Sequence, residues 1–345
     1  MGEVLRTKVI ASLGPASYPS EVMEELMKAG VYMFRNNFSH MPYDEYRRQR
    51  ELVRGLNEKL GTSVLMQADL QGPHIRIGKI ADEGILLQER QTYWFSTTAG
   101  QPEEFDIPIN DATIHQFVQV GQPISFLNGF IEGEVTEVQG HRIAVRMTNS
   151  GTLKSNKAIN LPETQLDSCL TEKDLADLQF LVEEGVDWIA LSFVSRKEEV
   201  EKVREIIGDR PIKIMSKIER QSALGNAEEI IAASDAIMVA RGDLGIEIPM
   251  EEVPFVQKDL IDLSHYVKKP AVVATQMLYS LVHSQRPTRA EVSDVSGAVL
   301  ERADALLLSD ETTEGVDPVN AVKTMMTIIE RAEQHMYGEK DYFSV

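Results

Sequence analysis

Two carboxylates and a lysine end two neighbouring apolar runs, a pattern that could hold a divalent metal ion. One run ends with Lys217 and Glu219, whose side chains face the same way if the run is a strand, and the next run ends at Asp243. Paired carboxylates suit Mg²⁺ or Mn²⁺, and a lysine beside them could neutralise charge on an oxygen. A structural ion pair explains Lys217 and Glu219 equally well, but the addition of Asp243 favours a metal site.

A second polar group follows two earlier apolar runs. One run ends with Arg35, Asn37 and Ser39 at every second position, so that their side chains share one face of a strand. Asp69 ends the next run. Arginine binds phosphate through paired hydrogen bonds, whereas asparagine and serine oxygens suit a monovalent cation or a sugar hydroxyl. In isolation such a spacing is more often a capping or loop network. Only the position of these residues in the fold favours a binding site.

Two further run ends carry hydroxyl and acidic groups. Thr275 ends one run and could relay a proton through water, although threonine is also a routine strand residue. Residues 309–312 (Ser-Asp-Glu-Thr) end the last run, where they could meet a nucleotide or cap the following helix. His40, His74 and His115 show no recognised histidine-based metal spacing, so zinc is not expected.

Eight apolar runs of strand length must position these residues. Most are separated by amphipathic stretches of helical length, several of which begin at a Ser or Thr cap and end at Gly. This alternation predicts an α/β fold, a parallel (β/α)8 barrel whose strand ends converge on one mouth where catalytic residues gather. The runs cover residues 8–14, 31–40, 63–70, 187–193, 212–219, 236–243, 270–276 and 305–311.

Residues 73–167 interrupt this alternation. They alternate apolar and polar residues and contain turn sequences such as Asn128-Gly129 and Gln139-Gly140. We therefore expect a small β domain inserted after the third strand, with residues 1–72 and 168–345 forming the barrel. Loops that follow barrel strands lie on the catalytic face, so the insert would cover the active site as a lid; a decorative insertion is the alternative.

Composition excludes several classes of partner. The formal net charge of −19 argues against nucleic acid, because a phosphate backbone requires a basic surface, but small anions can still bind to local cations. No run approaches the roughly 20 apolar residues of a membrane span, so no membrane partner is expected. Cys169 is the only cysteine, so no disulfide can form within the chain, which fits a cytoplasmic location.

Taken together, the motifs resemble those of the pyruvate kinase family. The matching segments, in the family's order and spacing, are TKVIASLGPAS, FRNNFSH, LTEKDLADLQF, IMSKIERQ, IMVARGDLGIEIP, KPAVVATQML and PTRAEVSDVSGAVLERADALLLSDET. The resemblance covers almost all of the barrel and is weaker in the insert. It implies transfer of a phosphoryl group from phosphoenolpyruvate to ADP, giving pyruvate and ATP, with Mg²⁺ or Mn²⁺ as cofactor and K⁺ as a second candidate cofactor.

The resemblance also implies roles for the residues that handle the three-carbon acid. Glu219 and Asp243 would hold the divalent metal, and Lys217 would neutralise the transferring phosphoryl group and the enolate oxygen. Arg35 would bind phosphate, and Thr275 would belong to the relay that brings a proton to the enolate. The backbone of Ala240, Arg241 and Gly242, together with Asp243, would receive the substrate carboxylate.

The remaining implied positions concern potassium and the nucleotide. The potassium positions would be Asn37, Ser39, Asp69 and the Leu70 carbonyl. The nucleotide positions would be Asn37, His40, Arg76 and Lys173.

Departures from the family pattern gather on the nucleotide and lid side. Gln71 removes a positive charge where a lysine is usual, and Asp310 adds a negative charge where a glycine is usual. His74 replaces a glutamate or lysine, which leaves potassium dependence open. The other changes are Leu70 for threonine, Met41 for glycine, and Leu127 and Asn128 for two aspartates.

These departures keep three hypotheses open. The first is a short pyruvate kinase. The second is a related enzyme that uses a pyruvate enolate with a changed partner, such as a metal-dependent decarboxylase or lyase, or a phosphotransferase with another acceptor. The third, a non-catalytic regulatory paralogue, is least favoured because Lys217, Glu219, Asp243 and Thr275 are intact. The sequence ends soon after the eighth helix, so we expect no C-terminal effector domain, and any homo-oligomer would form through barrel faces.

Overall fold

A closed barrel of eight parallel strands forms the larger part of the molecule, in the order β1-β16-β15-β14-β13-β12-β3-β2. The computed structural model describes residues 5–97, 103, 105–127, 129–164 and 168–338. The barrel strands are β1 (Lys8–Ser12), β2 (Val31–Asn37), β3 (Leu65–Asp69), β12 (Trp188–Leu191), β13 (Lys213–Ile218), β14 (Ala236–Ala240), β15 (Ala271–Ala274) and β16 (Ala305–Leu308). The predicted (β/α)8 barrel is confirmed.

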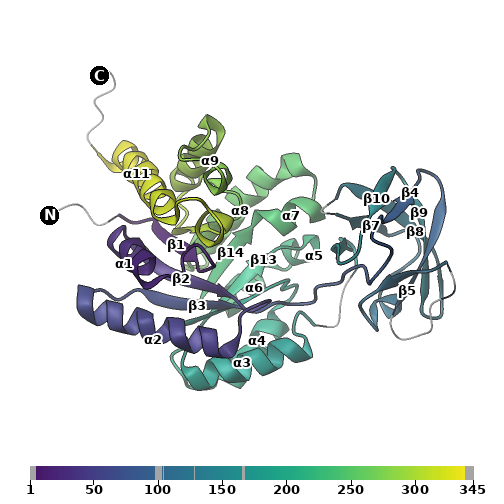
Figure 1. The fold of residues 1–345 in the computed structure, drawn as a ribbon, viewed down its shortest axis with the longest axis horizontal. Coiled ribbons are helices and arrows are strands. Elements are labelled where there is room, and N and C mark those ends of the chain that lie inside the picture. The colour runs from purple at the N-terminus through teal and green to yellow at the C-terminus, as the bar shows by residue number, and fades with distance from the viewer. Residues whose placement is uncertain (1–4, 98–102, 104, 128, 165–167, 339–345) are drawn as a thin grey trace.

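Helices surround this barrel (Figure 1). They are α1 (Ser20–Lys28), α2 (Tyr43–Leu60), α3 (Glu172–Glu184), α4 (Lys197–Ile207), α5 (Gln221–Leu224), α6 (Ala227–Ala233), α7 (Arg241–Glu247), α8 (Val253–Tyr266), α9 (Arg289–Leu300), α10 (Asp310–Thr313) and α11 (Pro318–Tyr337), with 3-10 turns at Met250–Glu252 and Tyr279–Val282. Local sequence fixes their ends: the Thr171 side chain caps α3 in a capping box with Asp174, and Gly185 ends it in the left-handed conformation. Among the described residues, none of the helices combines the length and apolar character that crossing a membrane would require.

Apolar side chains form two layers around the strands. The inner layer fills the barrel with residues such as Ile10, Met33, Met215 and Leu307, and the outer layer lies between strands and helices. Cys169 belongs to the outer layer and is 3% exposed. Burial raises the pKa of its thiol well above the usual value, which keeps the thiol protonated and unreactive.

The segment between β3 and α3 folds into separate sheets with their own hydrophobic cluster. A six-stranded sheet has the order β11-β7-β8-β9-β5-β6, and β10 pairs with β4. The strands are β4 (Ile85–Leu87), β5 (Thr92–Thr97), β6 (Ile107–Ile109), β7 (Pro123–Phe126), β8 (Ile131–Gln139), β9 (Arg142–Met147), β10 (Gly151–Leu153) and β11 (Ile159–Asn160), with a 3-10 turn at Ile114–Gln116. Figure 1 shows these sheets set off from the barrel, on the side of α5 and α7. Gly140, with φ of 58°, makes the β8–β9 turn, whereas Asn128 lies outside the described residues.

All eight barrel strands end before the last residue of the apolar run that predicted them, and after two of them the chain passes directly into a helix. β14 ends at Ala240, and Arg241 begins α7, so Asp243 lies in the first turn of a helix. The turn is tight because a Cβ on Gly242 would lie 2.8 Å from the Thr275 methyl group. Similarly, β16 ends at Leu308 and Asp310 begins α10.

Candidate active site

A chain of alternating buried charges crosses the mouth of the barrel. The Arg35 Nε donates to Asp69 Oδ2 at 2.7 Å, and the Lys217 Nζ lies 3.5 Å from the same oxygen. On its other side, Lys217 pairs with Glu219 at 2.8 Å and donates to the Ser192 hydroxyl at 2.9 Å. The ends of β2, β3 and β13 thus bring together four of the predicted site residues.

These neighbours fix the charge states of the network. Burial works to raise the pKa of Asp69, but Arg35 and Lys217 hold it below its usual value. Burial works to lower the pKa of Lys217, yet Glu219 and Asp69 raise it above its usual value. Lys217 therefore remains a cation at neutral pH, as a group that neutralises oxygen charge must.

Asp243 faces a different electrostatic setting. Burial and the nearby charge of Glu219 raise the pKa of Asp243 to about 6, and Lys217 offsets only part of this effect. Glu219 itself also accepts a hydrogen bond from the Phe193 N–H at 2.8 Å. This carboxylate pair, buried at Glu219 and half-buried at Asp243, is compensated incompletely by one lysine and fits a divalent cation.

The donor set matches the hard divalent ions. Among the described residues, no group of three or more His, Cys, Asp and Glu side chains is arranged to hold a metal ion. Mg²⁺ and Mn²⁺ bind through one or two carboxylates plus water and substrate oxygens, so Glu219 and Asp243 fit such an ion without further protein ligands.

The side chain of Arg241 has a supporting position. It forms an ion pair with Asp294 at 2.6 Å and donates to the carbonyl oxygens of Thr275 at 2.9 Å and Ala274 at 3.3 Å. Thr275 has a φ of 78°, a left-handed conformation that costs a threonine energy and needs outside support. Arg241 thus holds the turn that carries Thr275, and its side chain is committed to that turn.

Asn37, Asp69 and Leu70, three of the predicted potassium positions, have oxygens that already accept hydrogen bonds. Asn37 and Asp69 are register neighbours on β2 and β3. Asn37 Oδ1 accepts from the Ser39 N–H at 3.1 Å, and the Leu70 carbonyl accepts from the Ser192 hydroxyl at 2.7 Å.

Three of the four predicted nucleotide positions line two different cavities, and Lys173 lines neither of them. A cavity of about 330 Å³ includes Arg35, Asn37 and His40 in its lining, opposite the carboxylates of Asp310 and Glu314. Lys173 is held by the Phe38 carbonyl and the Asp177 carboxylate, both 2.6 Å from its Nζ.

The second cavity, about 540 Å³, lies between the barrel mouth and the inserted sheets. Its lining includes Arg76 and Asp243, and also Arg220 and Glu247, which the sequence interpretation did not single out. Arg220 directly follows Glu219 and was therefore within reach of a sequence argument, whereas Glu247 lies at the end of α7, away from any strand end.

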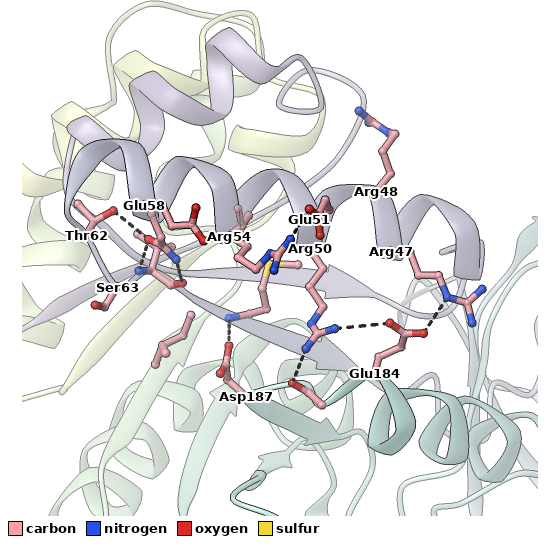
Figure 2. A pocket seen from close by; sticks show the side chains of 16 residues that line it. Arg47, Arg48, Arg50, Glu51, Arg54, Glu58, Thr62, Ser63, Glu184 and Asp187 are labelled. Atoms are coloured by element: carbon pink, nitrogen blue, oxygen red, sulfur yellow. Dashed lines mark hydrogen bonds and ion pairs between the residues drawn. The ribbon is translucent and has the colours of Figure 1, made fainter.

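A cavity of about 950 Å³ opens elsewhere, between α2 and the start of β3. Four arginines line it: Arg47, Arg48, Arg50 and Arg54. Figure 2 shows Arg47 and Arg50 directed at Glu184, while Arg48 points away. These arginines are 41–68% exposed and each has a carboxylate partner, so the cavity presents no uncompensated charge to a ligand.

Comparisons with known proteins agree with this geometry. A family model described as pyruvate kinase, barrel domain, matches residues 4–322. The chain is 42% identical to a pyruvate kinase of Agrobacterium vitis, over 96% of this chain and 69% of the relative. It is 39% identical to a pyruvate kinase of Mycobacterium tuberculosis, over 96% and 71%. The crystal structure of a pyruvate kinase from Cryptosporidium parvum superposes with a TM-score of 0.91 at 33% identity, covering 98% of this chain and 70% of that one. This chain belongs to the pyruvate kinase family.

Proposed function

We propose that this chain transfers the phosphoryl group of phosphoenolpyruvate to ADP at the barrel mouth, forming pyruvate and ATP. The observation that carries the proposal is the buried network of Arg35, Asp69, Lys217 and Glu219, beside Asp243. Phosphoryl transfer depends on positioning and charge neutralisation more than on covalent help from the protein. A site made of fixed buried charges supports that chemistry.

The cations of the network would hold the transferring group. Arg35 would bind phosphate oxygens while its Nε stays fixed by Asp69, and Lys217 would offset charge on the phosphoryl and enolate oxygens. Because Asp69 and Glu219 hold these cations in place, they need little rearrangement during the reaction.

Glu219 and Asp243 would hold the Mg²⁺ or Mn²⁺ ion. When bound, this ion supplies positive charge that polarises the substrate oxygens. The carboxylates contribute a site that is deprotonated once the ion is present, since a cation opposes the burial and the repulsion that raise the pKa of Asp243.

The acid end of the substrate would meet α7 and β15. The Ala240–Gly242 backbone would receive the carboxylate beside Thr275, whose methyl group packs where a Cβ on Gly242 would lie. The Thr275 hydroxyl would pass a proton to the enolate, in a position that Arg241 maintains through the Thr275 carbonyl.

The inserted sheets would act as a lid over the barrel. We assign residues 73–167 to this lid and residues 1–72 and 168–345 to the catalytic barrel. The cavity between them contains both Arg76 and Asp243, so closure over a bound substrate would exclude water from the transferring group.

Several finer assignments belong to the same proposal. K⁺ would bind near Asn37, Ser39, Asp69 and the Leu70 carbonyl. Arg35 and Lys217 already neutralise Asp69, so we expect K⁺ to stimulate turnover modestly. ADP would contact Asn37, His40, Arg76 and Lys173. The enzyme would work in the cytoplasm. Homo-oligomers would form through barrel faces.

One assay tests the proposed function. Pyruvate formation from phosphoenolpyruvate is measured with ADP and Mg²⁺, with and without K⁺, beside decarboxylation of oxaloacetate. We expect ADP-dependent pyruvate formation that stops when EDTA removes the metal. The carboxylates of Asp310 and Glu314, opposite His40, favour a changed phosphoryl acceptor as the second candidate. Turnover of phosphoenolpyruvate with an acceptor other than ADP would support that candidate, whereas decarboxylation without ADP-dependent turnover would indicate a lyase.

A further inference from the structure

Arg220 is a buried cation whose Nε donates to no other group among the described residues. It is 7% exposed, and its Nε is buried with no hydrogen-bond partner. Within the described residues its guanidinium forms no ion pair or hydrogen bond. Its Cζ lies 5.6 Å from the centroid of the Phe193 ring, and its charge acts on the Glu247 carboxyl. Burying a guanidinium is costly unless an anion compensates it, so this residue is in a position to bind a ligand.

Arg220 belongs to a continuous row of contacts that leads to the lid. Its guanidinium lies against Phe193, the Phe193 ring meets the His74 ring at 5.5 Å, and His74 Nδ1 lies 3.2 Å from the Arg76 Nη2. Burial and Arg76 lower the pKa of His74, so it is the neutral hydrogen-bond acceptor in this pair. Two guanidinium groups therefore flank an uncharged aromatic pair in one cavity.

The charges around this cavity favour an anion with several negative charges. Its lining includes three cations, Arg76, Lys157 and Arg220, and two carboxylates, Asp243 and Glu247. Asp243 would be committed to the divalent ion. Burial raises the pKa of Glu247 to about 7 despite the opposing effect of Arg220, so Glu247 neutralises the arginine only in part.

The position of Arg220 separates it from the acid end of the substrate. Gly242 and Thr275, where the substrate carboxylate is expected, lie at the ends of β14 and β15. Arg220 follows β13 and contacts Phe193, which follows β12, on the other side of Asp243. An anion at Arg220 is thus a different group from the carboxylate at Gly242.

We propose that Arg220, together with Arg76, binds the oligophosphate end of the nucleotide. The proposal rests on the function proposed above and adds a specificity-determining residue to it. The two arginines would approach the phosphates from both ends of the Phe193–His74 pair, so that lid closure brings Arg76 toward Arg220.

The test compares Arg220→Gln and Arg220→Lys with the unchanged chain. We expect Arg220→Gln to raise the KM for ADP and the calorimetric Kd for Mg-ADP and Mg-tripolyphosphate roughly tenfold, the usual effect of losing a charged hydrogen bond. The KM for phosphoenolpyruvate should stay within about twofold, and Arg220→Lys should recover part of the loss. Arg48→Gln, an exposed arginine on α2 paired with Glu45, serves as the control.

Thermal unfolding separates binding from a structural role. Removing an uncompensated buried cation should leave the Tm of Arg220→Gln unchanged or raise it. A lower Tm with an unchanged Kd for Mg-tripolyphosphate would overturn the proposal, and so would a rise in the KM for phosphoenolpyruvate alone. If the unchanged chain forms no pyruvate, the proposed function fails, yet the calorimetric comparison still decides the role of Arg220.

Discussion

Arginines line the hollow on α2 and also the cavities at the barrel mouth, and the two sets of arginines differ in exposure and pairing. Along α2, Arg47 and Arg50 share the Glu184 carboxylate at the surface, where solvent screens each charge. At the barrel mouth, the Arg35 side chain is 14% exposed and Arg220 is 7% exposed. The hollow on α2 is the larger of the two regions, yet its charges are satisfied. The size of a hollow therefore does not identify a site in this chain. The two regions differ instead in how deeply their arginines are buried.

Substitution of Lys217 at the barrel mouth should cause the largest loss of turnover. Lys217→Met should reduce turnover by about a thousandfold, because it removes a buried cation aimed at developing oxygen charge, while Mn²⁺ binding to Glu219 and Asp243 persists. Steady-state assays and calorimetry with Mn²⁺ measure the two effects. Lys213→Met is the matched control, since Lys213 is an exposed lysine at the start of the same strand. Near-normal turnover of Lys217→Met would contradict the assigned role.

Arg241 is a positioning residue whose effect should be smaller. Arg241→Lys keeps the charge but cannot hold Asp294 and the Thr275 carbonyl together. We expect kcat to fall between about tenfold and a hundredfold through misplacement of Thr275, with little change in the KM for ADP. Rapid-mixing measurements with solvent deuterium should show a larger isotope effect if proton delivery has slowed, and an unchanged isotope effect would argue against the assignment.

Glu247 provides a test through stability and pH. Burial raises its pKa from 4.5 to about 7, so the folded state binds the proton more tightly than the unfolded state. The metal-free protein should therefore lose stability as pH rises from about 4.5 to 7. Glu247→Gln removes this loss and should be more stable than the unchanged chain by on the order of 2 kcal/mol at pH 8, with little difference near pH 4.5. Urea unfolding at both pH values measures the free energy of unfolding, and the exposed Glu251→Gln serves as the control. If stability changes with pH in the same way in Glu247→Gln and in the unchanged chain, the raised pKa of Glu247 is refuted.

The smallest effect belongs to the hollow on α2. Arg50→Gln breaks an exposed contact with Glu184 at 3.5 Å, so the free energy of unfolding should change by less than about 0.5 kcal/mol and turnover should be unaffected. Urea unfolding and the pyruvate assay measure both. A marked loss of turnover would show that this hollow takes part in function and would remove the distinction between the two regions.

The sequence was sufficient to predict the barrel and the pairing of Lys217 with Glu219. Strand-length apolar runs and capped amphipathic helices define the barrel, and Lys217 and Glu219 meet because their spacing follows the alternation of a strand. The sequence could not show that β14 ends at Ala240, since the turn into α7 depends on the close approach of Gly242 to Thr275.

Partners distant in sequence were also beyond prediction. Arg241 reaches Asp294, 53 residues later, and no local pattern in the chain marks that pair. Arg220 lies within the IMSKIERQ motif, but its burial and its unpartnered Nε are properties of the packed structure. Tertiary contact, rather than residue type, distinguishes these groups.

The single buried thiol makes the proposed closure of the inserted sheets directly measurable. Cys169 is 3% exposed and its thiol pKa is raised, so maleimide dyes should leave it unlabelled. One cysteine introduced at exposed Phe130, beside the cavity, and one at exposed Tyr266 on α8 would then be the only reactive positions. Energy transfer between dyes at these two sites would report the closing of the cavity in single molecules, without any need to remove a native cysteine first.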